Sequence, residues 1–194
     1  KVCLYSVDFH EIEQLQHQGK WAETADILAK AAQAVEAGGA DVFLICTNTM
    51  HKVAAEVQAA VNIPMIHIAD ATAKNLLAGG LTKVGLLGTA FTMQQEFYKG
   101  RLTSEFGIEV LVPNTEQQVM VHEVIYQELC LGEINLASKQ KYLEVIQDLY
   151  NQGAQAVILG CTEITLLVQQ KDTQVPLYDT TAIHAQSAVA VALG

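Results

Sequence analysis

Charged residues are scarce in this 194-residue sequence: they make up 16% of the chain, against 51% hydrophobic residues. Disordered chains combine low hydrophobicity with high charge, so this composition excludes a disordered protein and predicts a globular one. Basic residues are scarcest, with 11 Lys and Arg against 21 Asp and Glu and a formal net charge of −10. Because nucleic acids and anionic membranes attract clustered Lys and Arg, neither is expected as the main partner.

Several familiar motifs are also missing. No apolar run reaches the roughly 20 residues of a membrane-spanning helix, so the sequence predicts a soluble protein. The four cysteines form no C-x-x-C pair and the six histidines no H-x-H or H-E-x-x-H motif, which argues against a metal site. We therefore expect free thiols in a reducing, cytoplasmic compartment. The sequence begins at Lys1 rather than Met, inside an apparent strand, so we expect natural residues to precede it.

What the sequence does contain is an alternation of short apolar runs with longer amphipathic ones, the pattern of an α/β protein. Strands are predicted over 1–7, 41–46, 65–68, 83–88, 109–113, 156–160 and 176–179. Helices are predicted over 21–37, 49–61, 70–78, 92–102, 116–131, 136–151 and 181–193, with a further one after 163. Asp70 is the expected N-cap of its helix, and capping boxes are expected at Thr92 with Gln95 and at Thr115 with Gln118.

We expect two similar lobes, each a parallel sheet flanked by helices. The first covers residues 1–79 and the second 80–180, and the last helix, 181–194, packs back on the first lobe. Gly79 and Gly80 form the only plausible joint, since no low-complexity linker separates the two halves. A weak internal repeat supports this division, because residues 41–49 and 156–163 are both an apolar run followed by a polar cluster with a cysteine.

These two polar clusters are the candidate site. The first reads Cys46-Thr47-Asn48-Thr49, and the second reads Cys161-Thr162-Glu163. In open α/β sheets, ligands bind beyond the carboxyl ends of the strands, where both clusters are expected to lie. A cysteine between a strand and a helix N-terminus is expected to have a lowered pKa, and hydroxyls and amides there suit a carboxylate group. The alternative is that both cysteines are core residues, a common role for this residue type.

Together with Gly85-Leu86-Leu87-Gly88-Thr89, the clusters resemble the paired signatures of the aspartate/glutamate racemase superfamily, which read Cys-Asn-Thr and Cys-Thr-Glu or Cys-Thr-His. The chain looks most similar to bacterial L-aspartate/glutamate-specific or broad-specificity amino-acid racemases. The resemblance implies a site in the cleft between two lobes, no cofactor and a homodimer. It also implies interconversion of L- and D-amino acids, in which one residue removes the Cα proton and another protonates the opposite face.

By matched position, the resemblance assigns this chemistry to Thr47 and Cys161. Thr47 stands where the family's first cysteine precedes Asn-Thr, and Cys46, one residue earlier, would point to the opposite face of a strand. A threonine hydroxyl is a poorer base than a thiolate, so we expect Cys161 to be the stronger base and one enantiomer to be preferred. The expected substrate-binding residues are Gln16, Asn48, Thr49, Thr162 and Glu163. Glu163 either orients the substrate ammonium or simply favours the helix N-terminus through its charge.

Substrate range and reaction remain open. Aspartate racemases often carry Pro-Asp-Arg after their first strand, whereas this chain has no arginine before Arg101 and offers only the uncharged Gln16, which favours a broader range. A related reaction, such as maleate isomerisation or malonate decarboxylation, and a non-catalytic carboxylate-binding role are the alternatives. No lysine suggests a pyridoxal Schiff base, and G-x-G-x-x-G and Walker patterns are absent. Gly85 and Gly88 are better explained by tight strand-to-helix packing than by phosphate binding.

Overall fold

The computed structural model describes all residues, 1–194, and the chain divides into two compact units. The first unit comprises Lys1–Ile45 and Met50–His67, and the second comprises Cys46–Thr49 and Ile68–Gly194. Residues 68–78 thus belong to the second unit, whereas the sequence places them in its first lobe. The lobe boundary at residue 79 stays a prediction.

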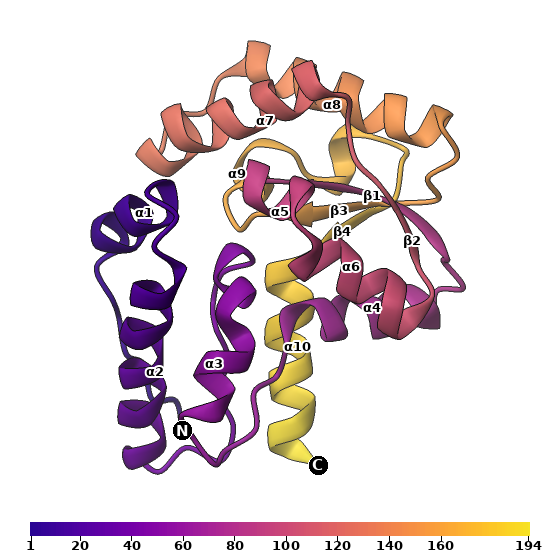
Figure 1. The fold of residues 1–194 in the computed structure, drawn as a ribbon. Coiled ribbons are helices and arrows are strands. Elements are labelled where there is room, and N and C mark those ends of the chain that lie inside the picture. Colours follow the sequence, from indigo (N-terminus) through magenta and orange to yellow (C-terminus); the bar gives the residue numbers. More distant parts are fainter. The chain divides into compact units, whose positions relative to one another are not determined.

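The second unit is built on a four-stranded parallel sheet, in the order β2-β1-β3-β4 (Figure 1). Its strands are β1 (Lys83–Gly88), β2 (Glu109–Leu111), β3 (Val157–Gly160) and β4 (Leu177–Asp179). All four lie where the sequence predicts strands, and the α/β class is confirmed. Its helices are α4 (Ile68–Ala78), α5 (Ala90–Gln94), α6 (Glu96–Phe106), α7 (Thr115–Gln127), α8 (Leu136–Asn151), α9 (Ile164–Leu167) and α10 (Thr180–Leu193), with short 3₁₀ turns at Leu129–Leu131 and Gln170–Asp172.

Both faces of this sheet are buried, as is usual for parallel strands. Leu86 and Ile158 point to one face, where α4 and α6 pack, and Leu87 and Leu159 point to the other, where α7 and α8 pack (Figure 1). Because side chains alternate along a strand, two adjacent apolar residues in β1 and in β3 supply both cores. The long apolar runs at 83–88 and 156–160 are therefore explained by burial on both sides. Helix α10 packs against α4 within the same unit.

The first unit is mainly helical. It contains α1 (Phe9–His17), α2 (Trp21–Ala37), most of a 3₁₀ turn at Thr49–Val53, and α3 (Ala54–Ala59). The predicted helix over 21–37 is confirmed. The strands predicted over 1–7, 41–46 and 65–68 are wrong as strands: residues 1–8 have no regular structure, and the other two share one parallel bridge between Phe43 and Met65. A strand is stabilised by a neighbouring ladder, and no ladder extends beyond this bridge.

Three predicted helix starts are also wrong. Asp70 lies in the first turn of α4 rather than at its N-cap, and its carboxylate pairs with Arg101 of α6, with Nη2 to Oδ2 at 2.9 Å. Thr89 instead of Thr92 caps α5, and Asn114 with Gln117 forms the capping box of α7. Spacing alone fits several neighbouring positions, and for α5 and α7 the extended backbone at Thr89 and Asn114 marks the actual N-cap. No helix combines the length and apolar character that crossing a membrane requires.

Candidate functional site

The two motifs meet at the carboxyl edge of the sheet in the second unit. Gly88 of β1 pairs with Gly160 of β3, so the residues that follow them, Thr89 and Cys161, leave neighbouring strands at the same edge. Thr180 leaves this edge too, since Leu159 of β3 pairs with Asp179 of β4. Residues 46–49 come to the edge from a distant part of the sequence, because Asn48 and Thr49 hydrogen-bond to Thr180 and Thr89.

Glycine allows the strand ends to approach closely. A Cβ on Gly88 would lie 2.8 Å from the Gly160 carbonyl oxygen, and one on Gly160 would lie 2.7 Å from the Leu87 carbonyl oxygen. Real Cβ contacts are not this short, and backbone atoms in a sheet cannot move aside cheaply. A Cβ on Gly88 would also lie 3.1 Å from Thr92 Cβ of α5, which agrees with the strand-to-helix packing predicted for Gly88.

Asn48 is held at the edge by a short relay. Its Nδ2 donates to Thr180 Oγ1 at 3.0 Å, and Thr180 Oγ1 donates to the Leu159 carbonyl oxygen at 2.9 Å. Leu159 precedes Cys161 by two residues, so the relay fixes the first motif beside the second. Asn48 and Thr180 are buried, and Asn48 Oδ1 has no hydrogen-bond partner.

Three buried threonine hydroxyls cluster next to this relay. Thr49 Oγ1 lies 3.1 Å from Thr89 Oγ1 and 3.5 Å from Thr92 Oγ1, and the last two lie 3.2 Å apart. Thr89 also caps α5 by accepting from the Thr92 N–H. Hydroxyls both donate and accept, so the cluster can rearrange to donate to an anionic group.

Sequence reasoning missed Thr89, Thr92 and Thr180 as members of this edge. The signal was available for two of them, since Thr89 and Thr180 each directly follow a predicted strand, where ligands bind in such sheets. Thr92 carried no comparable signal, because its place depends on where α5 begins.

In the second motif, Glu163 accepts two hydrogen bonds on one oxygen. Cys161 Sγ donates to Glu163 Oε2 at 2.9 Å, and Thr162 Oγ1 donates to the same oxygen at 2.7 Å. Burial raises the pKa of the Cys161 thiol well above its ordinary value, and the charge of Glu163 and this hydrogen bond raise it further. The lowered pKa expected from the sequence is wrong, because burial, the largest cause, and then the Glu163 carboxylate raise it, whereas the four-residue α9 has only a weak dipole to oppose them.

Cys46 and Thr47 differ in exposure. The Cys46 side chain is exposed, Thr47 is partly buried, and the segment around them is not a strand. Gln16 belongs to the first unit, where it lies on α1 and its Nε2 donates to Met50 Sδ at 2.9 Å. Gln16 is thus the one residue expected to form the site that lies outside the second unit. The second unit contains the others: Thr47, Asn48, Thr49, Cys161, Thr162 and Glu163.

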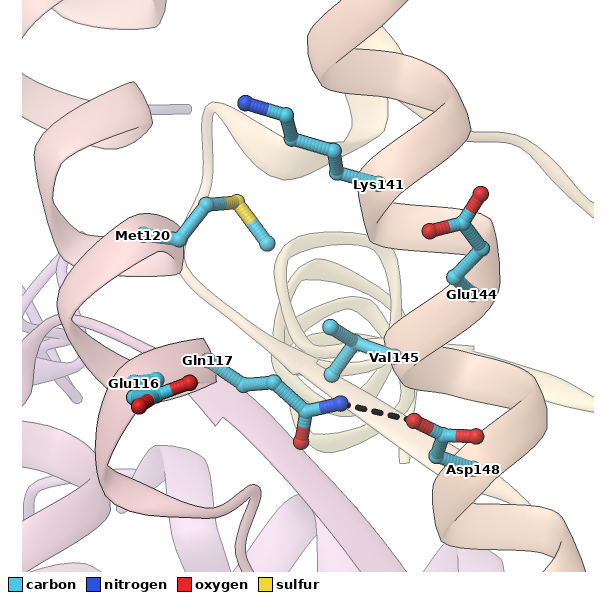
Figure 2. A pocket seen from close by; sticks show the side chains of 7 residues that line it. All are labelled: Glu116, Gln117, Met120, Lys141, Glu144, Val145 and Asp148. Atoms are coloured by element: carbon cyan, nitrogen blue, oxygen red, sulfur yellow. Dashed lines mark hydrogen bonds between the residues drawn. The ribbon is translucent and has the colours of Figure 1, made fainter.

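A separate hollow of about 250 Å³ lies between α7 and α8, away from these motifs in the sequence (Figure 2). Met120 and Val145 line it, and Gln117 reaches across to donate to Asp148 Oδ2 at 2.7 Å. Its other lining residues are Glu116, Lys141 and Glu144. Because the Gln117 side-chain amide bridges the two helices, we interpret the hollow as a groove between packed helices. No three His, Cys, Asp or Glu side chains of the chain are grouped so that they could hold a metal ion.

Comparison with known proteins gives the family. The profile of the Asp/Glu/hydantoin racemase family matches residues 1–188. A protein from Yersinia pestis assigned as an Asp/Glu racemase has a crystal structure that superimposes with a TM-score of 0.93 at 53% identity, covering 100% of this chain and 84% of that one. An aspartate racemase homologue from Pyrococcus horikoshii OT3 superimposes with a TM-score of 0.85 at 37% identity, over 99% and 83% of the two chains.

A further relative supports the same family. The broad-specificity amino-acid racemase RacX of Bacillus subtilis is 27% identical over 172 residues, which are 88% of this chain and 73% of RacX. The relatives matched here are amino-acid racemases, so the isomerase class expected from the sequence is confirmed. Together with the two motifs at one edge of the parallel sheet, these matches show that the chain belongs to the Asp/Glu/hydantoin racemase family.

Proposed function

We propose that the chain is a cofactor-independent amino-acid racemase that works by two-base proton transfer at Cα. The observation that carries this proposal is the meeting of the two motifs at one sheet edge, where the Cys161 thiol contacts the Glu163 carboxylate at 2.9 Å. RacX is named a broad-specificity amino-acid racemase, and this sequence has no arginine before Arg101, so the proposed range extends beyond aspartate and glutamate. The proposal includes a homodimer in a cytoplasmic compartment.

Cys161 and Thr47 are the proposed acid/base pair. In one direction, Cys161 as thiolate takes the Cα proton and becomes a thiol, while the Thr47 hydroxyl gives its proton to the opposite face of the carbanion. Thr47 is then an alkoxide and Cys161 a thiol, and in the reverse direction this alkoxide takes the Cα proton while Cys161 donates its proton. Exchange of one proton between the two side chains through solvent restores the first state. A Cα–H is a very weak acid, so developing charge on the substrate carboxylate must be stabilised by donors. Thr49, with its hydroxyl neighbours Thr89 and Thr92, and Thr162 supply such donors.

Glu163 links substrate binding to the state of Cys161. In the free protein, the Glu163 carboxylate accepts a hydrogen bond from the Cys161 thiol and disfavours loss of the thiol proton. A substrate ammonium near Glu163 compensates this negative charge, so the pKa of Cys161 falls when the substrate is bound. The base is thus formed mainly in the complex, which limits side reactions of a free thiolate.

Unequal bases affect the kinetic constants in a restricted way. The L- and D-forms of an amino acid have equal free energy, so the equilibrium constant is one and kcat/KM must be the same in both directions. The enantiomer preference expected from the sequence therefore cannot appear in kcat/KM. The preference appears instead as a difference in kcat between the two enantiomers, and KM differs between them by the same factor.

Incubation in heavy water tests the proposal. A panel of L-amino acids is followed by proton NMR for loss of the Cα–H signal and by chiral chromatography for the D-form. We expect deuterium uptake at Cα together with racemisation. Turnover of maleate or a malonate without Cα exchange of amino acids would indicate the related chemistries, and ligand stabilisation without any exchange would indicate a binding protein.

A further inference from the structure

The start of α5 is held by a side chain from another helix. The Ala90 N–H donates to His122 Nδ1 at 3.1 Å. Ala90 is the first residue of α5 and directly follows Thr89, whereas His122 lies on α7, 32 residues further along the chain. A ring nitrogen that accepts a hydrogen bond carries no proton, so this imidazole carries its proton on Nε2.

This bond and one within α5 together fix the peptide group between Thr89 and Ala90. Its N–H is held by His122, and its carbonyl oxygen accepts from the Met93 N–H at 3.0 Å. The N–H and the carbonyl of a planar peptide group point to opposite sides, so bonds to both restrict its rotation. The Thr89 Cα lies in the same plane, and the direction of its side chain is therefore restricted as well.

The Thr89 hydroxyl belongs to the threonine cluster that the proposed function uses. It lies 3.1 Å from Thr49 Oγ1 and 3.2 Å from Thr92 Oγ1, and the Thr89 side chain is buried. A donor stabilises developing charge best when it is already oriented before the reaction, because reorientation during the reaction costs free energy. Whatever fixes the Thr89 peptide therefore contributes to the rate.

We infer that His122 is a positioning residue for the reaction: its Nδ1 fixes the peptide group between Thr89 and Ala90 and thereby orients the Thr89 hydroxyl toward the substrate carboxylate. This inference rests on the proposed function. His122 needs no contact with the substrate for this role, since it acts through the backbone of α5.

The ring contacts of His122 suggest the alternative, a role in packing only. The centroid of its ring lies 4.8 Å from that of Tyr126 and 6.3 Å from that of Phe91, whose ring is nearly perpendicular at 85°. These contacts need a ring but not Nδ1, whereas the bond to Ala90 needs an acceptor but not a ring. Two substitutions separate the roles. His122→Phe keeps a ring and removes the acceptor, and His122→Asn removes the ring and keeps an amide oxygen near the position of Nδ1.

Two measurements on each variant test the inference. Hydrogen exchange of the Ala90 amide, followed by NMR, reports the bond itself. Cα exchange in heavy water, with whichever of the twenty proteinogenic amino acids exchanges fastest, gives kcat and KM. Glu123→Gln, at an exposed position next to His122 on α7, is the matched control and should change neither.

For His122→Phe we expect the Ala90 amide to exchange about tenfold faster or more. We also expect kcat to fall about tenfold with KM changed less than about threefold, because an oriented donor matters most where charge develops, in the transition state. His122→Asn should stay within about threefold of the wild type in both measurements. His122→Leu, which also lacks the acceptor, serves if His122→Phe is unstable.

A double-mutant cycle tests whether His122 acts through Thr89. Thr89→Val removes the hydroxyl and keeps the side-chain shape. If His122 acts by orienting this hydroxyl, adding His122→Phe to Thr89→Val should lower kcat less than about twofold further.

Wild-type kcat in His122→Phe, equal losses in His122→Phe and His122→Asn, or additive losses in the cycle would each overturn the inference. Wild-type exchange of the Ala90 amide in His122→Phe would also overturn it, and this readout does not depend on activity. A failure of the proposed function is visible separately, as the absence of Cα exchange by the wild type with every amino acid, and the inferred role in the reaction would fall with it.

Discussion

The two cysteine-bearing motifs have similar sequences and different surroundings. Cys161 directly follows β3, is partly buried and donates to Glu163, whereas Cys46 is exposed and follows a segment with a single β-bridge. In the first motif the buried members are instead Asn48 and Thr49, which form the hydrogen bonds to the sheet edge.

This difference separates the two roles of the site. The second motif is positioned by a strand and supplies a titratable thiol next to a carboxylate. The first motif is positioned by its own side-chain hydrogen bonds and supplies uncharged groups, Asn48 and Thr49. A repeat in sequence thus does not imply equal surroundings, and the cysteine of the first motif, unlike Cys161, is exposed.

The largest expected effect comes from removing one cysteine and not the other. Cys161→Ala should lower racemisation and Cα exchange by about 10³-fold, because a general acid/base group contributes about 10²–10⁴-fold. Cys46→Ala should stay within about twofold of the wild type. Rates of exchange in heavy water measure both. Full activity of Cys161→Ala, or a large loss in Cys46→Ala, would reverse the comparison.

Thr47 should give the next largest effect. Thr47→Ala should lower exchange by about 10²-fold, while Thr47→Ser keeps the hydroxyl and most of the activity. Thr47→Cys creates two thiols, so kcat for the L- and D-substrates should become more alike, with kcat/KM still equal. Initial rates from both pure enantiomers measure this. If Thr47→Ala were as active as the wild type, Thr47 would not be the second acid/base.

The close approach of β1 and β3 predicts a stability effect at the second motif. Gly160→Ala places a Cβ 2.7 Å from the Leu87 carbonyl oxygen and should lower the free energy of unfolding by about 1–3 kcal/mol. Gly100→Ala is the control, because Gly100 lies within α6 and the new Cβ meets only the Glu96 side chain. This substitution should raise the free energy of unfolding by up to about 1 kcal/mol. Urea denaturation compares them, and equal destabilisation would contradict the strand-end argument.

The sequence was sufficient to predict the parts of the fold that depend on local patterns. The apolar runs at 83–88 and 156–160 identified the central strands, and Gly38 and Gly39 marked the end of α2. Apolar character alone failed at residues 1–7 and 41–46, because a strand also depends on the pairing of distant segments. The predicted helix caps lie near the actual ones but not at them, because several residues near the start of a helix can cap it.

For the site, the motifs identified Asn48, Thr49 and Cys161 at the sheet edge, but not how they are bonded. Burial of Cys161 and then its contact with Glu163 raise the pKa that the sequence predicted to be lowered. A spacing of two residues could not distinguish a neighbouring carboxylate from one pointing away. The relay through Thr180 joins residues 132 positions apart in the sequence and was invisible to motif reasoning. Side-chain orientation at the ends of strands is decided by such long-range bonds.

The smallest expected effect sharpens the comparison at Cys161 itself. The charge of Glu163 and its hydrogen bond both raise the pKa of this thiol, so Glu163→Gln should lower that pKa, although burial still keeps it above the ordinary value. At a fixed pH below the midpoint, alkylation of Cys161 by iodoacetamide should then be about three- to tenfold faster, because a shift of one unit changes the thiolate fraction tenfold. Peptide mapping separates Cys161 from the exposed Cys46, whose rate should not change, and Glu144→Gln on the surface of α8 should leave both rates as they are. A slower reaction of Cys161 in Glu163→Gln would mean that the carboxylate assists the loss of the thiol proton in the free protein rather than opposing it.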